Sequence, residues 1–154
     1  MTDFTQHGSC NCQSIRYTIT DAPLFTHVCH CTKCQKRTGS AFVLNAMVLE
    51  DDFALSEGAL DSFSTLTDSG AELSAYTCPS CRDVLYYTLP GFQRIIMVAG
   101  GTFDDASWLK PDAHIFTRSK QAWVELSDEI PAYREMYELE KAWPQASLAK
   151  LAES

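Results

Sequence analysis

The chain has 154 residues, close to the commonest domain size, and 45% of them are hydrophobic while 21% are charged. These proportions are ordinary for a globular protein and exclude wholesale disorder. The formal net charge of −8 argues against nucleic acid or an anionic membrane surface as a partner. The first residues lack the basic stretch and apolar run of a signal peptide, and no apolar run reaches the roughly 18 residues that cross a bilayer. We therefore expect a cytoplasmic protein whose cysteines stay reduced.

Short strands separated by turns dominate the predicted elements. Alternation of apolar and polar residues predicts a first strand over residues 15–20. Apolar or β-prone runs bounded by Gly, Pro and Asp turns predict the later strands, at 41–49, 60–65, 71–77, 84–89, 94–99 and 121–126. A proline at position 131 begins a pattern that predicts a helix over 131–141. The expected fold is mainly β, with antiparallel sheets and a short C-terminal helix.

Seven cysteines gather in three clusters, at residues 10–12, 29–34 and 78–81. The last cluster is a CxxC turn that directs two sulfurs at one point. The first is a CxC pair, whose side chains share one face of an extended segment. Zinc takes four ligands in a tetrahedron and accepts sulfur at every corner. Two pairs complete one such set, and the middle cluster leaves a second set one ligand short. The sequence therefore predicts two zinc ions per chain, one held by Cys10, Cys12, Cys78 and Cys81, and one by Cys29, Cys31 and Cys34.

Other uses of the cysteines fit less well. A redox role for Cys78 and Cys81 would usually place the motif at the start of a helix, whereas residues 82–87 indicate another strand. A disulfide framework fits neither the odd number of cysteines nor the expected cytoplasmic location. His27 shares the strand parity of Cys29 and is an alternative fourth ligand for the second metal. His30 lies between two ligands, and its ring is expected to point away from the metal.

Three cations surround the middle cluster in an otherwise acidic chain, namely Lys33, Lys36 and Arg37. Such cations attract an anionic ligand to an open metal site and favour thiolates nearby. We expect them to draw a small anionic ligand to the open metal position. The alternative is a solvated turn with no ligand.

The ordered runs at residues 8–12, 29–40 and 78–81, with a weaker later run at 100–105, resemble the glutathione-dependent formaldehyde-activating enzyme family, also called the centromere-protein-V/GFA domain. The resemblance covers residues 4–133 and implies a zinc-binding domain there, followed by a helical extension over 134–154. It implies a β-tent fold of antiparallel sheets and the same division of the cysteines, with a catalytic zinc on Cys29, Cys31 and Cys34 and a structural zinc on the other four.

The resemblance also implies an activity in which carbon–sulfur bonds are made and broken. The founding reaction joins glutathione to formaldehyde and gives S-(hydroxymethyl)glutathione. The resemblance thus implies glutathione as the small-molecule thiol that Lys33, Lys36 and Arg37 would help to bind. We expect a carbon–sulfur lyase of this type, and the incomplete second ligand set favours it because a purely structural site is normally closed. The alternative is a non-catalytic zinc module that binds a thiol or a protein partner. The sequence assigns no general acid or base.

Overall fold

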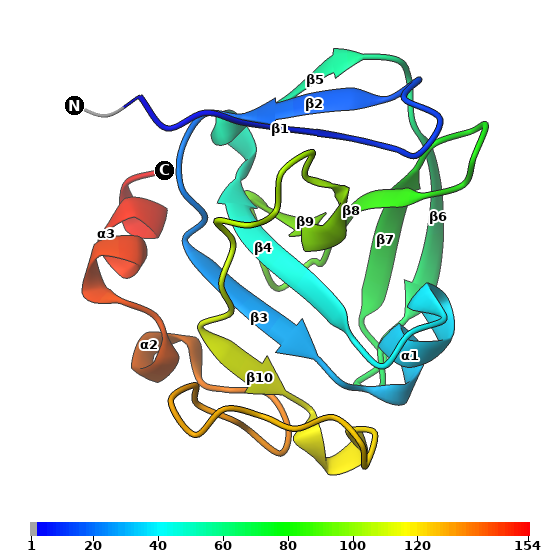
Figure 1. The fold of residues 1–154 in the computed structure, drawn as a ribbon. Coiled ribbons are helices and arrows are strands. Elements are labelled where there is room, and N and C mark those ends of the chain that lie inside the picture. The colour runs from blue at the N-terminus through cyan, green and yellow to red at the C-terminus, as the bar shows by residue number, and fades with distance from the viewer. Residues whose placement is uncertain (1–2) are drawn as a thin grey trace.

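The structure, a computed structural model, describes residues 3–154, and its ten strands form two sheets (Figure 1). The smaller sheet has the order β1-β2-β5, with strands Gln6–Ser9, Arg16–Ile19 and Phe53–Glu57. The larger sheet has the order β10-β3-β4-β9-β8-β7-β6. Its strands are β3 (Phe25–Cys29), β4 (Val43–Leu49), β6 (Asp61–Leu66), β7 (Glu72–Thr77), β8 (Val84–Thr88), β9 (Ile95–Ala99) and β10 (Ala113–Ile115). Among the ten strands of residues 3–154, β10 and β3 pair in parallel and the other pairs are antiparallel.

Strands β4 and β9 lie in the middle of the larger sheet and are buried on both faces. Because successive side chains of a strand point to opposite faces, Ala46 and Val48 pack in one apolar cluster with Tyr17 of the smaller sheet. Met47 and Leu49 pack in the other cluster. This explains why the run over 41–49 is continuously apolar instead of alternating.

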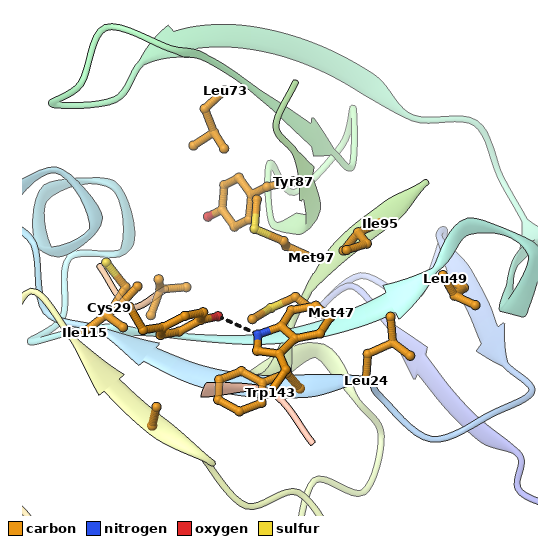
Figure 2. Close-up of a cluster of buried hydrophobic side chains, with 14 of the residues drawn as sticks. Leu24, Cys29, Met47, Leu49, Leu73, Tyr87, Ile95, Met97, Ile115 and Trp143 are labelled. Carbon is orange, nitrogen blue, oxygen red and sulfur yellow. Dashed lines mark hydrogen bonds between the residues drawn. The ribbon is translucent and has the colours of Figure 1, made fainter. Parts of the chain in front are cut away.

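The C-terminal residues pack against the second of these clusters (Figure 2). The Trp143 ring is buried and stacks on Phe25 with the ring centroids 5.5 Å apart. Its indole Nε1 donates a hydrogen bond to the Tyr137 hydroxyl at 3.2 Å. Farther along, the Lys150 ammonium donates to Asp21 at 2.6 Å and to Asp52 at 2.9 Å. The last helix is thereby tied to two turns of the sheet region.

The mainly β fold is confirmed, and six of the seven expected strands are present. The strand expected over residues 121–126 is wrong: within the part of the chain that the structure describes, nothing pairs with this segment. Its backbone forms a turn in which Val124 N–H donates to Gln121 C=O, and Trp123 is 74% exposed. A β-prone composition does not make a strand when no sheet edge lies beside it.

The helix expected over residues 131–141 is also wrong in its position. Residues 131–135 run beside β10, where Tyr133 N–H donates to His114 C=O and Phe116 N–H donates to Glu135 C=O. A backbone segment that pairs with a strand cannot also close helical hydrogen bonds. The helices come later, as α2 (Leu139–Ala142) and α3 (Gln145–Glu153).

Four strands and one helix have no counterpart among the predicted elements. These are β1, β3, β5, β10 and the helix α1 (Thr32–Thr38), which follows β3 within the middle cysteine cluster. Three short 3₁₀ turns complete the fold, η1 (Glu50–Asp52), η2 (Gly100–Thr102) and η3 (Thr117–Ser119). No helix in residues 3–154 is long and apolar enough to cross a membrane.

Candidate metal centres and pocket

The first sulfur cluster joins two turns that are far apart in the sequence. Cys10 and Cys12 lie in the turn between β1 and β2, and Cys78 and Cys81 lie in the turn between β7 and β8. Both turns are closed by backbone hydrogen bonds to their first cysteine, from Gln13 N–H to Cys10 C=O and from Arg82 N–H to Cys78 C=O. Gln13 and Arg82 both adopt left-handed backbone conformations, with φ of 62° and 67°. The two turns therefore present their sulfurs in a similar way.

The spacing of these four sulfurs suits a tetrahedral zinc ion. All four lie within 4.8 Å of one another, and the Cys12 sulfur lies 3.6 Å from the sulfurs of Cys10 and Cys78. Zinc–sulfur bonds of about 2.3 Å in a tetrahedron hold the sulfurs about 3.8 Å apart, whereas a disulfide needs about 2.0 Å. The cluster can hold a metal ion, and its donor set is one that zinc prefers.

Hydrogen-bond donors lie around the Cys78 sulfur of this cluster and favour its thiolate form. The Ser14 hydroxyl lies 3.2 Å from the Cys78 sulfur, and the N–H groups of Ser80 and Cys81 donate to the same atom at 3.4 and 3.5 Å. The hydroxyl contact first, and then these N–H groups, lower the pKa of the Cys78 thiol to about 5. A deprotonated sulfur at neutral pH is the form that binds zinc.

The second sulfur cluster is local. Cys29 is the last residue of β3, Cys31 caps α1, and Cys34 lies in the first turn of α1. Their three sulfurs lie within 4.8 Å of one another, and the Cys34 N–H donates to the Cys31 sulfur at 3.3 Å. Hydrogen bonds from the thiols of Cys29 and Cys34 lower the pKa of the Cys31 thiol. Three sulfurs can hold a metal ion and leave a coordination position for another ligand.

The rings of His27 and His30, the two histidines near this cluster, have hydrogen-bond partners other than the three sulfurs. His27 is buried, with Nδ1 2.9 Å from the Tyr137 hydroxyl and Nε2 3.4 Å from the Asn45 amide. Burial lowers the pKa of His27 to about 3, so the ring is neutral. His30 is fully buried, and its Nε2 lies 3.0 Å from Nδ1 of His114. Because both ring nitrogens of His27 have partners away from the sulfurs, the geometry does not support it as a fourth ligand.

A pocket of about 470 Å³ opens beside the three sulfurs of the second cluster. Strands β4, β7, β8 and β9 supply much of its wall, and the segments around residues 116 and 136 close it. Most of its lining is apolar, from Val43, Leu73, Tyr87, Leu89, Phe92, Met97, Phe116 and Met136. Leu73, Tyr87, Met97 and Cys29, which Figure 2 labels, belong both to the buried core cluster and to the lining of the pocket.

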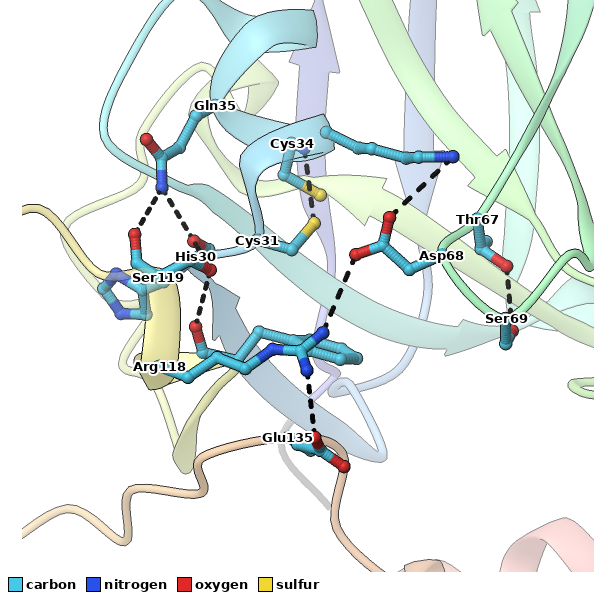
Figure 3. A network of polar contacts seen from close by, with 12 residues as sticks. His30, Cys31, Cys34, Gln35, Thr67, Asp68, Ser69, Arg118, Ser119 and Glu135 are labelled. Carbon is cyan, nitrogen blue, oxygen red and sulfur yellow. Dashed lines mark hydrogen bonds and ion pairs between the residues drawn. The ribbon is translucent and has the colours of Figure 1, made fainter.

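Charged side chains stand at the rim of this pocket and are largely paired with one another (Figure 3). Asp68 lies 3.8 Å from the Lys33 ammonium and 3.9 Å from the Arg118 guanidinium. Arg118 also pairs with Glu135 at 3.0 Å, and Lys33 donates to the backbone carbonyl of Leu66 at 2.7 Å. The hairpin between β6 and β7 is thus tied to α1 and to η3 across the pocket mouth.

Of the three cations singled out in the sequence, Arg37 has the most direct access to the cluster. Its guanidinium carbon lies 5.4 Å from the centre of the Tyr87 ring, and its Nη1 lies 3.9 Å from the Cys34 sulfur. Lys33 lines the pocket but is held by Asp68, and Lys36 is exposed and does not line it.

Sequence reasoning missed Tyr87, Asp68 and Arg118 as parts of the site. They come from β8, the hairpin after β6 and the turn after β10, and no local motif marks them. Only the pairing of strands brings these segments to the cysteines.

Comparison with known proteins identifies a family that matches this chain. Residues 5–119 match the family described as glutathione-dependent formaldehyde-activating enzyme. A curated protein of Emericella nidulans named "Putative glutathione-dependent formaldehyde-activating enzyme" is 35% identical over 79 residues, 50% of this chain and 39% of that protein. One of the same name from Podospora anserina is 27% identical over 115 residues, 71% of this chain and 53% of that protein. The chain thus spans about two-fifths to half the length of these relatives.

A crystal structure of a Rhodobacter sphaeroides protein is similar in fold, with a TM-score of 0.50 and 16% sequence identity. The likeness covers 68% of this chain and 91% of that protein. The family match spans about three-quarters of the chain and includes both sulfur clusters, as the ordered cysteine runs predicted. The chain therefore belongs to the glutathione-dependent formaldehyde-activating enzyme family.

Proposed function

We propose that this chain is a zinc-dependent carbon–sulfur lyase, resembling S-(hydroxymethyl)glutathione synthase, that adds a thiol to a carbonyl carbon. The observation that carries the proposal is a cluster of three sulfurs, with no fourth protein donor among the described residues, placed at the wall of a ligand-sized pocket. In the addition, a sulfur–carbon bond forms and the carbon–oxygen π bond breaks, while the proton of the thiol ends on the oxygen. The reverse reaction releases the thiol and the aldehyde.

The proposed roles follow from what each side chain contacts. Cys29, Cys31 and Cys34 would hold zinc, which when bound supplies the positive charge that keeps an incoming thiol deprotonated at neutral pH. Arg37, beside the Cys34 sulfur, would stabilise negative charge on the substrate sulfur or on the former carbonyl oxygen. Tyr87 is buried in the pocket wall, and burial raises the pKa of its hydroxyl, so it stays a hydrogen-bond donor.

The other four cysteines have a structural role in this proposal. Cys10, Cys12, Cys78 and Cys81 would close a second zinc site that offers no position to a substrate. That site joins the β1–β2 turn to the β7–β8 turn and so fixes the smaller sheet against the larger one. We place the protein in the cytoplasm, where free thiols stay reduced.

The test compares exchange rates, because glutathione and formaldehyde also combine without an enzyme. Exchange spectroscopy on a mixture of the two should show faster interconversion with their adduct when zinc-loaded protein is present. Cys34→Ser should remove the acceleration and one of two zinc ions per chain. Lys110→Ala, an exposed change outside the pocket, should keep both. Binding of glutathione without any acceleration would instead identify a non-catalytic thiol-binding module.

A further inference from the structure

The pocket beside the three sulfurs is much larger and more apolar than formaldehyde requires. Formaldehyde has no carbon beyond its carbonyl, whereas the pocket has a volume of about 470 Å³. That volume is in the range of about 300–1,000 Å³ typical of sites for whole small molecules. Glutathione carries two carboxylates and would gain little from the eight apolar side chains that line this pocket.

The apolar lining is part of a rigid framework and not a loosely covered surface. Val43, Leu73 and Met97 are buried members of the core cluster, and they come from three different strands. The charged residues at the rim add little net charge to this apolar lining, because Asp68 and Glu135 form ion pairs with Lys33 and Arg118. The pocket therefore presents an apolar interior to whatever group enters it.

A second cavity, of about 480 Å³, adjoins the apolar pocket and has a different character. The two share Arg37, Val43 and Tyr87. The second cavity is otherwise lined mostly by polar groups, among them Ser9, Asn11, Gln13, Thr38, Arg82 and Asp104. A ligand with one polar and one apolar half, joined near Arg37, would match the two cavities together.

We infer that the carbonyl substrate of this chain is an aldehyde that bears an apolar chain or ring of several carbons, and that this group fills the pocket beside Cys29, Cys31 and Cys34. The inference rests on the proposed function, which supplies glutathione as the thiol half of the ligand. The peptide part of that thiol would extend into the polar cavity. The new sulfur–carbon bond would then lie where the two cavities meet. Each methylene buried in the pocket should strengthen binding about fourfold.

S-alkylglutathiones are stable analogues of the adduct and give a readout independent of turnover. Calorimetry with the zinc-loaded protein should show affinity rising about fourfold per added methylene from S-methylglutathione through S-butylglutathione to S-hexylglutathione, until the pocket is full. Met136→Asn should weaken S-hexylglutathione binding by about fivefold and leave S-methylglutathione unchanged. Leu55→Asn is the matched control, because Leu55 is also 39% exposed but lies on β5, outside the pocket.

Two outcomes separate this inference from the proposed function. If all S-alkylglutathiones bind equally well, the apolar substrate is refuted while glutathione remains the thiol. If none of them binds, 1-hexanol is titrated alone. Binding of 1-hexanol that weakens in Met136→Asn would keep the apolar ligand and refute glutathione, and no binding of 1-hexanol would refute the inference itself.

Discussion

The two sulfur clusters should differ sharply in what their loss does to stability. Cys12 and Cys78 lie 66 positions apart, so a metal held between them closes a long loop. The entropy of closing such a loop in the unfolded chain corresponds to about 4 kcal/mol. Cys29 and Cys34 lie five positions apart, and the same relation gives about 2 kcal/mol. A chain of 154 residues loses about 2–4 °C of melting temperature per kcal/mol.

We therefore expect Cys78→Ser to melt about 8–16 °C below the parent protein, and Cys34→Ser only about 4–8 °C below it. Cys78→Ser is expected to aggregate if the whole binding free energy of a structural zinc, on the order of 10 kcal/mol, is lost with it. The assay is a thermal melt followed by circular dichroism, with zinc counted by native mass spectrometry on the same samples.

Cys12→Ser controls for simple core damage. Cys78 is fully buried but Cys12 is exposed, so a defect that arises from packing alone should spare Cys12→Ser. A defect that arises from the metal should affect both variants equally. If Cys34→Ser unfolds as readily as Cys78→Ser, both clusters are structural and the enzymatic proposal loses its basis.

Three further predictions concern the basic residues, the core and the last helix. Arg37→Ala should weaken glutathione binding severalfold in calorimetry while Lys36→Ala leaves it unchanged, and equal effects would mean that only general charge attracts the ligand. Tyr137→Phe removes a hydroxyl that hydrogen-bonds two buried rings, and urea denaturation should show a loss of about 1–3 kcal/mol. Lys150→Met should cost up to about 1 kcal/mol at neutral pH. The hydrogen bond from Lys150 lowers the pKa of Asp21. The stability that Lys150 contributes should therefore be present above about pH 4 and disappear as the pH falls further. If Lys150→Met is still less stable than the parent protein at pH 2, the contacts of the lysine stem matter instead.

The cysteine pattern by itself predicted how the sulfurs would group. CxC and CxxC spacings fix which sulfurs can meet within one turn, and zinc requires four ligands, so seven cysteines in three clusters divide into four and three. The structure brings Cys10 and Cys12 to Cys78 and Cys81, and keeps Cys29 to Cys34 together. The strands with their own apolar runs, such as β4 and β9, were predictable for a similar reason, since each run carries its signal within a few residues.

Contacts between segments far apart in the sequence decided the features that local patterns did not predict. Residues 131–135 carry a helical pattern but lie beside β10, because the free edge of that strand offers backbone partners that an isolated turn of helix cannot match. His27 lies on the same side of its strand pattern as Cys29, as a metal ligand would. Its Nδ1 instead lies within hydrogen-bond distance of the hydroxyl of Tyr137, a residue 110 positions away. The apolar wall of the pocket has no sequence signature, since its eight side chains come from four strands, the β8–β9 connection and two later segments. Local spacing determined which sulfurs could hold a metal ion together, whereas only the tertiary fold decided what kind of molecule can lie beside the three-sulfur cluster.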